Sequence, residues 1–288
     1  MILPALSVVI PNYNHARLLP ICLQALLEQS VQPLEIIILD DASTDDSVAV
    51  IQDFAARSPI IRFHRNERNQ GVVFGMNRGL ELARGDYVYF AAADDKVLPG
   101  LLEKSLRLRA QYPAAALSCT ISVWQEVNSG LSWHMGVGMA DKPCYLSPAR
   151  MVELEKRGEL FIASNTTLFK RSAILRAGGF IPELKWHCDW FGMYVSGFRD
   201  GICFVPDPLA VAYIYTASFH AAGRRNKQEY RQVLRRMLEL RGAQVDVACD
   251  GAEAMSKALS GAHDVLLMDI QMPGVDGYNA TEQLRIKG

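Results

Sequence analysis

The chain of 288 residues has no long apolar run, no clustered cysteines and no excess of charge of either sign. Its longest apolar stretches, such as residues 35–39 and 87–93, are far shorter than the roughly 18–20 residues that cross a bilayer. The formal net charge is −1, so no basic field predicts binding to nucleic acid. Hydrophobic residues make up 50% of the chain, a composition that excludes an intrinsically disordered protein.

The first residues show neither a basic leader nor a cleavage site, so we expect no secretory signal. The six cysteines form no CxxC pair and are widely and irregularly spaced. This spacing argues against a structural zinc site and against a disulfide scaffold. Free thiols together with the missing signal predict a cytoplasmic protein, and contact with the inner face of the membrane stays open.

Apolar runs typical of buried strands alternate with helical spacing through the first 111 residues. The runs cover residues 6–10, 34–39, 60–64 and 87–92, and the helical patterns cover 18–28, 45–56, 71–83 and 101–111. This alternation predicts an α/β domain with a mostly parallel sheet flanked by helices. Further along, we expect strands at 117–124, 161–169 and 202–205, a loop at 130–140 and a helix at 186–195.

Polar residues gather where three of the first four predicted strands end, at 12–14, 40–43 and 94–95. Ligands bind outside the carboxyl ends of the strands in open α/β sheets, so these residues predict a site at one edge. Adjacent carboxylates repel each other, and a divalent cation shared with substrate phosphates would relieve the repulsion. Capping of the following helix is the competing explanation for each acidic pair, and Ser43 or Thr44 is a further cap candidate.

Four strings together resemble a family 2 glycosyltransferase of the GT-A fold. They are VVIPNYN at 8–14, EIIILDDASTDDS at 35–47, NQGVVFGMNRGLELARGDYVYF at 69–90 and ADD at 93–95. The resemblance implies a GT-A nucleotide-sugar-binding domain over residues 1–222. It also implies a nucleotide-diphosphate sugar as the donor, commonly one of uridine or thymidine.

The same resemblance implies roles for the residues at the strand ends. Those of the base pocket would be Pro11, Asn12 and Tyr13, with Asp41 accepting hydrogen bonds from the base and Asp40 beside it. Packing of Tyr13 on the first helix is the alternative to stacking on the base.

Asp94 and Asp95 match the family's DXD-type motif. The resemblance implies that Asp95 ligates Mn²⁺ or Mg²⁺ and that Asp94 reaches the ribose or the metal. Many members carry one more acid at the position of Ala92, which leaves fewer carboxylates here for the ion.

Residues 178–183 and 186–190 also resemble this family, in which the acid at the start of the next helix is the general base. That role falls on Asp189, which would take a proton from the acceptor hydroxyl during an inverting displacement. A helix cap is the alternative for Asp189, and His187 is the rival base. Trp186 and Trp190 would line the site or stack on an acceptor sugar.

Two basic stretches near the end of this domain leave their roles open. His220, Arg224 and Arg225 could meet the diphosphate, although a solvated basic stretch is the explanation that we favour. Residues 223–240 carry six Lys or Arg against two Glu and have one apolar face, which predicts a basic amphipathic connecting helix. This helix would either dock through Val233, Leu234 and Met237 or lie on an anionic membrane surface.

Residues 241–288 resemble part of a response-regulator receiver domain, with Asp269 at the phosphoacceptor position. The acidic pair, the later hydroxyl residue and the later lysine of a receiver are not found where the family has them. We therefore expect an incomplete, flavodoxin-like fragment that is inactive as a receiver. Its two strands would lack their central partner, and their open edges would favour association, including a homo-oligomer.

The sequence predicts an inverting, metal-dependent glycosyltransferase that moves a sugar to a hydroxyl of a glycan or lipid-linked acceptor. A non-catalytic nucleotide-sugar binder is the first alternative, favoured by Ala92. A two-component signalling protein with a phosphoreceiver tail is the second. Turnover of a nucleotide sugar distinguishes the enzyme from the binder, and phosphorylation of Asp269 distinguishes the signalling protein.

Overall fold

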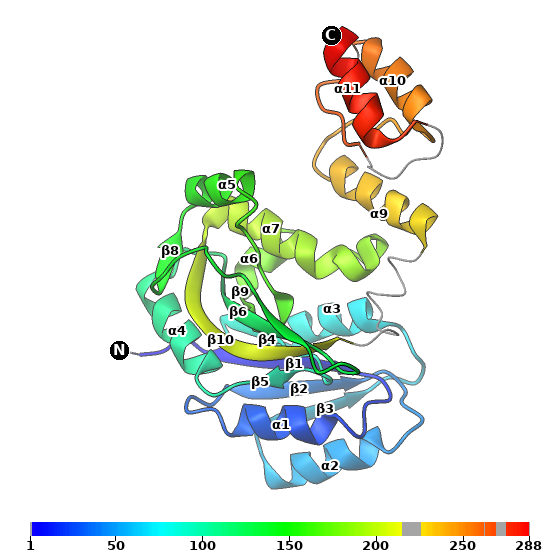
Figure 1. Cartoon of the computed structure of the whole chain (residues 1–288). Helices are drawn as coiled ribbons and strands as arrows, with labels where there is room; N and C mark the ends of the chain where they lie inside the picture. The colour runs from blue at the N-terminus through cyan, green and yellow to red at the C-terminus, as the bar shows by residue number, and fades with distance from the viewer. Residues whose placement is uncertain (1, 215–225, 262, 269–274, 288) are drawn as a thin grey trace. The chain divides into compact units, whose positions relative to one another are not determined.

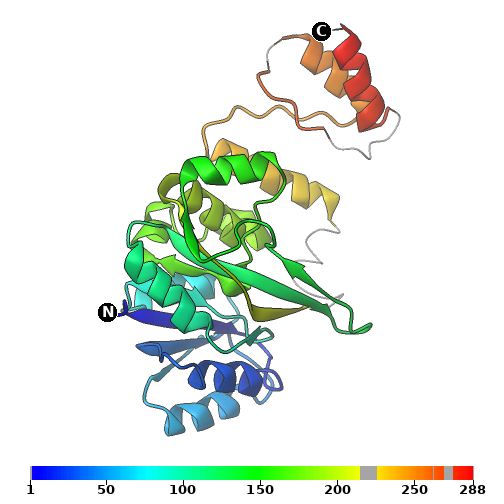
Figure 2. The ribbon, with the colours of Figure 1, turned by 60° about the vertical axis from the view of Figure 1, so that its left-hand side comes forward.

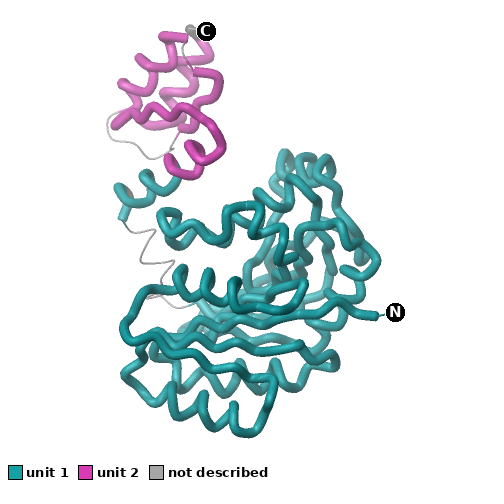
Figure 3. Tube along the Cα trace, turned by 180° about the vertical axis from the view of Figure 1, so that it is seen from behind, with its two compact units in different colours: residues 1–234 teal, residues 235–288 magenta. Residues whose placement is uncertain are grey.

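The computed structural model describes residues 2–214, 226–261, 263–268 and 275–287. They form two compact units, residues 1–234 and residues 235–288 (Figure 3). The division falls inside the connecting helix that the sequence predicts at 223–240, which the structure has as α9 (Lys227–Glu239).

Unit 1 is built on a ten-stranded sheet (Figure 1). Its strands are β1 (Leu6–Asn12), β2 (Glu35–Asp40), β3 (Ile61–Arg65), β4 (Tyr87–Phe90), β5 (Lys96–Val97), β6 (Leu117–Glu126), β7 (Ser132–Met135), β8 (Cys144–Leu146), β9 (Leu168–Lys170) and β10 (Ile202–Ile214). The order is β3-β2-β1-β4-β9-β6-β10-β5, while β7 pairs with β6 and β8 with β10. The strands β1 to β4 run parallel, and β9 is antiparallel to both β4 and β6. The carboxyl ends of β1, β2, β4 and β6 therefore share one edge of the sheet.

Helices cover both faces of this sheet, as the sequence predicts. They are α1 (Leu19–Leu27), α2 (Ser47–Arg57), α3 (Val72–Leu82), α4 (Leu101–Gln111), α5 (Pro148–Lys156), α6 (Arg171–Arg176) and α7 (Cys188–Asp200), with the 3-10 turns η1 (Ser164–Thr166) and η2 (Pro182–His187). Figure 1 shows α1 and α2 on one face and α3 on the other. Buried side chains of α1, α2 and α4 form one apolar core with those of β1, β2 and β4.

Three charged side chains are fully buried in the described part of unit 1, namely Glu35, Arg109 and Asp40, and all three are hydrogen-bonded. At the amino ends of the strands, Glu35 accepts hydrogen bonds from Ser7 Oγ at 2.7 Å and from the Arg84 backbone at 2.8 Å, and Arg62 pairs with it. Burial alone would raise the pKa of Glu35, but these donors lower it below its ordinary value. On α4, the Arg109 guanidinium donates to the carbonyls of Ala115 and Leu117 and to the Tyr87 hydroxyl.

The structure corrects several predicted strands and loops. The expected short strand at 202–205 continues to Ile214, because a register shift between Val205 and Ala210 accommodates the two prolines that lack N–H donors. The expected loop at 130–140 contains β7, which pairs with β6. The expected strand at 161–169 is reduced to η1 and β9, and the helix predicted from residue 186 begins at Cys188, after the turn η2.

Unit 2 contains the end of α9 together with α10 (Gly251–Leu259) and α11 (Gly277–Lys287). Asp250 caps α10 by accepting a hydrogen bond from the Glu253 backbone at 2.9 Å. The described residues of unit 2 hold no strand, so the expectation of two retained strands is wrong for them. A strand needs a partner for its backbone groups, and both expected strands would have paired with the same central strand. Asp269 lies outside the described residues.

The close contact between α3 and β1 yields a stability prediction. A Cβ atom added to Gly79 would lie 2.2 Å from Val9 Cγ1, so the helix can pack here only without a side chain. We expect Gly79→Ala to lower the free energy of unfolding by about 1–3 kcal/mol, because the helix must shift away from the strand. Urea unfolding measures this, with exposed Glu81→Ala in the same helix as the control. Equal stability of the two variants would contradict the prediction.

Candidate functional site

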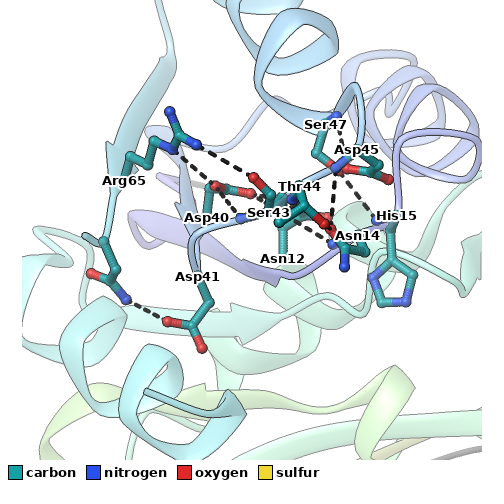
Figure 4. A network of polar contacts seen from close by, with 11 residues as sticks. Asn12, Asn14, His15, Asp40, Asp41, Ser43, Thr44, Asp45, Ser47 and Arg65 are labelled. Atoms are coloured by element: carbon teal, nitrogen blue, oxygen red, sulfur yellow. Dashed lines mark hydrogen bonds and ion pairs between the residues drawn. The ribbon is translucent and has the colours of Figure 1, made fainter. Parts of the chain in front are cut away.

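The register of β1 and β2 brings their polar ends together. Asn12 is paired with Asp40 across the two parallel strands, and both side chains are buried. Asn12 Nδ2 donates to Asp40 Oδ1 at 2.9 Å and to Ser43 Oγ at 3.2 Å. Asp40 also accepts from Ser43 Oγ and from the Ser43 backbone at 3.0 Å, and Arg65 lies 3.6 Å from its other oxygen (Figure 4). The oxygens of the Asp40 carboxylate therefore bind groups of the protein itself.

A second set of contacts joins the loops that follow β1 and β2 (Figure 4). Asn14 Oδ1 accepts a hydrogen bond from the Thr44 backbone at 2.8 Å, and Asn14 N donates to Ser43 Oγ at 2.9 Å. Asp45 accepts from the Ala16 backbone at 2.9 Å. Asn14 has a φ of 59°, a left-handed conformation that asparagine tolerates better than most residues. These bonds hold the two loops in one arrangement before any ligand binds.

Helix capping does not explain the first acidic pair as the sequence suggested. The helix α2 starts at Ser47 with Asp46 as its N-cap, so neither Asp40–Asp41 nor the candidates Ser43 and Thr44 cap it. Asp41 instead accepts from Asn66 Nδ2 at 2.8 Å and from the backbones of Gln70 at 2.9 Å and Gly71 at 2.7 Å. Asp41 thus fixes the loop before α3. Its role toward a nucleotide base remains a prediction.

The second acidic pair follows β4 at the same edge of the sheet. Both carboxyls are half-buried, and the next helix, α4, begins after Gly100 with no side-chain cap, so the pair does not cap it. Burial and the neighbouring Asp94 raise the pKa of Asp95 to about 8, and a hydrogen bond from the Tyr213 backbone partly opposes this rise. The same two carboxylates, together with burial, raise the pKa of the Cys22 thiol to about 12. The interactions that shift the pKa of Asp95 include no cationic side chain.

A divalent cation fits this pair by its donor chemistry. Mn²⁺ and Mg²⁺ prefer carboxylate oxygens, and a cation would favour the charged form of Asp95 that burial opposes. Among the described residues, no group of three or more His, Cys, Asp or Glu side chains could hold a metal by itself. The ion would therefore need further oxygen ligands from phosphate and water.

The rest of the predicted base pocket lies on β1 and just after it. Tyr13 is 44% exposed, so part of its ring is open to a ligand. Pro11 is half-buried against α3, where a Cβ on Gly75 would lie 3.3 Å from the proline ring. Asn12 Oδ1 is buried and has no hydrogen-bond partner among the described residues.

The candidate base lies in the first turn of α7. Asp189 Oδ1 accepts a hydrogen bond from the Trp190 backbone at 2.7 Å. The preceding turn η2 has Lys185 at a φ of 49°, and Lys185 forms an ion pair with Glu229 of α9. The His187 ring lies 5.6 Å from that of Tyr230 on the same helix. The first turns of α9 therefore pack on the segment that carries Asp189 and His187.

The basic connecting helix is only partly as predicted. Val233 and Met237 are buried, whereas Leu234 is 39% exposed. His220, Arg224 and Arg225 lie outside the described residues. No helix in the described part of the chain is long and apolar enough to span a membrane.

Several contacts at the site could not have been found from the sequence. Asn66, Gln70 and Gly71 bind Asp41 from a loop 25 to 30 residues away, and two of these contacts use backbone N–H groups. The backbone of Tyr213, near the end of β10, donates a hydrogen bond to Asp95. Backbone donors carry no side-chain signature, so no motif marks them.

Comparisons with known proteins agree with this geometry. The model of the family described as Glycosyl transferase family 2 matches residues 7–176, and that of the response regulator receiver domain matches residues 226–288. An uncharacterized protein of Mycobacterium tuberculosis is 30% identical over 220 residues, which cover 72% of this chain and 66% of that protein. The chain spans two thirds or less of the length of such curated relatives.

Two solved structures share the fold at low sequence identity. The Staphylococcus aureus TarS in complex with UDP-GlcNAc has a TM-score of 0.66 at 16% identity, over 84% of this chain and 68% of that one. A mannosyltransferase from Pyrobaculum calidifontis, in complex with GDP-Man and Mn²⁺, has a TM-score of 0.61 at 18% identity. That likeness covers 85% of this chain and 67% of the other.

The raised pKa of Asp95 predicts a pH-dependent stability in the presence of EDTA. The folded state keeps a proton on Asp95 up to about pH 8, whereas the unfolded chain releases it near the ordinary aspartate pKa of 3.8. Since the folded state then binds more protons, the free energy of unfolding falls as the pH rises through this window. We expect this loss between about pH 5.5 and about pH 8.5 in the wild type and a smaller loss in Asp95→Asn.

Urea unfolding at the two pH values measures this difference. Asp94→Asn serves as the intermediate case, because it removes the neighbouring charge but leaves Asp95 half-buried. The same pH dependence in the wild type and in Asp95→Asn would refute the assignment.

Proposed function

Since the chain belongs to glycosyl transferase family 2, we propose that it moves a sugar from a nucleotide-diphosphate sugar to an acceptor hydroxyl by a metal-dependent, inverting displacement. The chain is an enzyme of the glycosyltransferase type and has the GT-A fold. One observation supports the detailed proposal above the others. The exposed Tyr13, the fixed Asp40–Ser43 loop and the Asp94–Asp95 pair converge on the carboxyl edge of β1, β2 and β4.

The nucleotide would bind at the ends of β1 and β2. Pro11, Asn12 and Tyr13 would surround the base, with the exposed Tyr13 ring available for stacking. Asn12 Oδ1, buried without a partner, is a candidate acceptor for a base N–H group. Asp40 would act by holding Asn12 and Ser43, and Asp41 by holding the 66–71 loop as well as by contacting the base.

The diphosphate would meet the acidic pair after β4. Asp95, with Asp94 beside it, would hold Mn²⁺ or Mg²⁺, and Asp94 is also a candidate ligand of the ribose. When bound, such an ion neutralises the charge that grows on the leaving diphosphate. The GDP-Man and Mn²⁺ present in the Pyrobaculum calidifontis structure support this pairing of donor and metal.

The proton of the acceptor hydroxyl would pass to Asp189. A carboxylate at the start of α7 suits this task if it lies on the side of the sugar opposite the diphosphate, because the oxygen then attacks as its proton leaves. The hydrogen bond from the Trp190 backbone holds Asp189 Oδ1 in place. His187, whose ring contacts those of Trp190 and Tyr230, is the rival base.

The acceptor would be a glycan or a lipid-linked sugar. The basic residues of α9 would favour an anionic membrane surface, each contributing about 1 kcal/mol when close to it. The tail matches the receiver family, but we propose that it is inactive as a receiver. Stoichiometric labelling of Asp269 by acetyl phosphate would instead favour the signalling alternative.

A donor screen tests the proposed function. We expect uridine, guanosine or thymidine diphosphate sugars to raise the melting temperature in the presence of Mn²⁺ but not in EDTA, and one of them to be turned over. Asp95→Ala should abolish the metal-dependent part of donor binding in calorimetry, because the diphosphate loses its bridge to the protein. Unchanged affinity of this variant in Mn²⁺ would refute the metal assignment, and donor binding without turnover would favour a nucleotide-sugar binder.

The base is tested by one substitution with two measurements. Asp189→Asn should keep donor binding but lower transfer by about 10²–10⁴-fold, the usual effect of losing a general base. His187→Ala is the matched variant, and we expect it to retain most of the transfer. The reverse result would assign the base to His187.

A further inference from the structure

The strands β6 and β7 form a hairpin that carries two tryptophans opposite each other. Trp124 is paired with Trp133 in the antiparallel register, and their ring centroids lie 6.2 Å apart. Phe161 contacts Trp124 edge-on at 5.9 Å. Trp133 is nevertheless 41% exposed. We call Trp124 and Trp133 the tryptophan pair. Figure 2 shows its two strands as part of the long green hairpin.

The register of the sheet places this pair beside the acidic site. The Tyr213 backbone of β10 donates a hydrogen bond to Asp95, and its neighbour Ala212 is paired with Trp124 on β6. Adjacent strands lie about 4.8 Å apart, so Trp124 is one strand spacing from the strand that contacts Asp95. Trp133, one strand further out, is correspondingly farther from the acidic pair.

The hairpin is held in one shape by its own turn. The Glu126 carboxylate accepts hydrogen bonds from the backbones of Ser129 at 2.7 Å and Asn128 at 3.1 Å, and Ser129 Oγ accepts one from Leu131 N at 3.2 Å. The pairing of Glu126 N with the Leu131 carbonyl at 2.8 Å closes the loop. The tryptophan pair is therefore positioned before a ligand arrives, which lowers the entropic cost of binding.

The charge of the hairpin indicates what it binds. Residues 121–140 contain one acid, Glu126, and no Lys or Arg, so nothing in them attracts an anionic membrane surface or a phosphate. Large aromatic rings with little charge around them suit a ligand with apolar C–H faces and many hydroxyls. A sugar ring is such a ligand, because its C–H face packs on the aromatic ring and its hydroxyls stay in water.

We propose that the tryptophan pair binds a sugar of the acceptor, next to the one that receives the transferred group. This inference rests on the proposed function, in which the diphosphate of the donor binds at Asp95. Because Trp133 lies two strand spacings from β10, its ring is a subsite for an acceptor of at least two sugars. The acceptor class is therefore an oligosaccharide, free or lipid-linked, and the exposed ring of Trp133 contributes to its binding.

Saturation-transfer NMR on the full chain tests this subsite. The probes are methyl β-glycosides of glucose, galactose and N-acetylglucosamine and the corresponding β-1,4-linked disaccharides, each with the nucleotide that stabilises the protein most. We expect at least one disaccharide to give a signal that Trp133→Ala lowers at least tenfold and Trp133→Phe largely restores. Leu131→Ala, which removes a 69% exposed apolar side chain from the same hairpin, should leave the signal unchanged.

Several results would overturn the proposal. One is the absence of a signal from all six probes on the wild type, and another is an equal signal in Trp133→Ala. A third is flotation with phosphatidylcholine–phosphatidylglycerol vesicles that both Trp133→Ala and Leu131→Ala abolish, which would assign the hairpin to lipid. Nucleotide binding, measured on the same samples by calorimetry, separates these outcomes from a failure of the proposed function, because the hairpin substitutions leave the nucleotide site intact.

Discussion

The hydrogen bonds of the buried Asp40 carboxylate are the contacts on which the proposed nucleotide site depends. This carboxylate lies at the end of a central parallel strand, fully enclosed, and is satisfied by Asn12, Ser43 and the nearby Arg65. A buried carboxylate is costly unless its oxygens are hydrogen-bonded, so these partners have little freedom to move. Asn14, Thr44 and Asp45 extend the same bonds to the loop surface. The loops that follow β1 and β2 therefore keep one arrangement as long as the sheet is folded.

The acidic pair after β4 is less well stabilised by its surroundings than Asp40 is. Asp95 is placed where burial and Asp94 disfavour its charge, and a single backbone donor from β10 only partly compensates. Hydrogen bonds thus stabilise the charge of the Asp40 carboxylate, whereas the surroundings of Asp95 disfavour its charge. In the proposed function, a cation and a diphosphate would bind at this acidic pair together, which would link donor binding to metal binding. Trp124 of the tryptophan pair lies on the strand next to this backbone donor, so β10 would connect the proposed donor side with the proposed acceptor side.

Much of unit 1 could be predicted because local pattern and tertiary environment agree there. The helix at residues 101–111 and the strands near 6–12 and 35–40 follow from apolar spacing, since each buries one well-defined face. Prediction failed where pairing with distant residues decided the outcome. β10 continues past two prolines because β6 supplies a partner along its length, and β7 exists because β6 lies beside it. The described residues of unit 2 hold neither of the two expected strands, because the central strand with which both would pair is not among them.

The sequence by itself determined which side chains gather at the carboxyl ends of the strands, because a parallel α/β pattern leaves one edge for them. It also determined the family, since four motifs recur in order and spacing. Tertiary structure alone decided how those side chains are used. Asp40 is hydrogen-bonded by Ser43 and Asn12, Asp41 is hydrogen-bonded by a distant loop, and Asp95 beside Asp94 keeps its proton up to about pH 8. The reason is physical: burial and backbone donors set the state of a carboxylate, and both come from segments far apart in the chain.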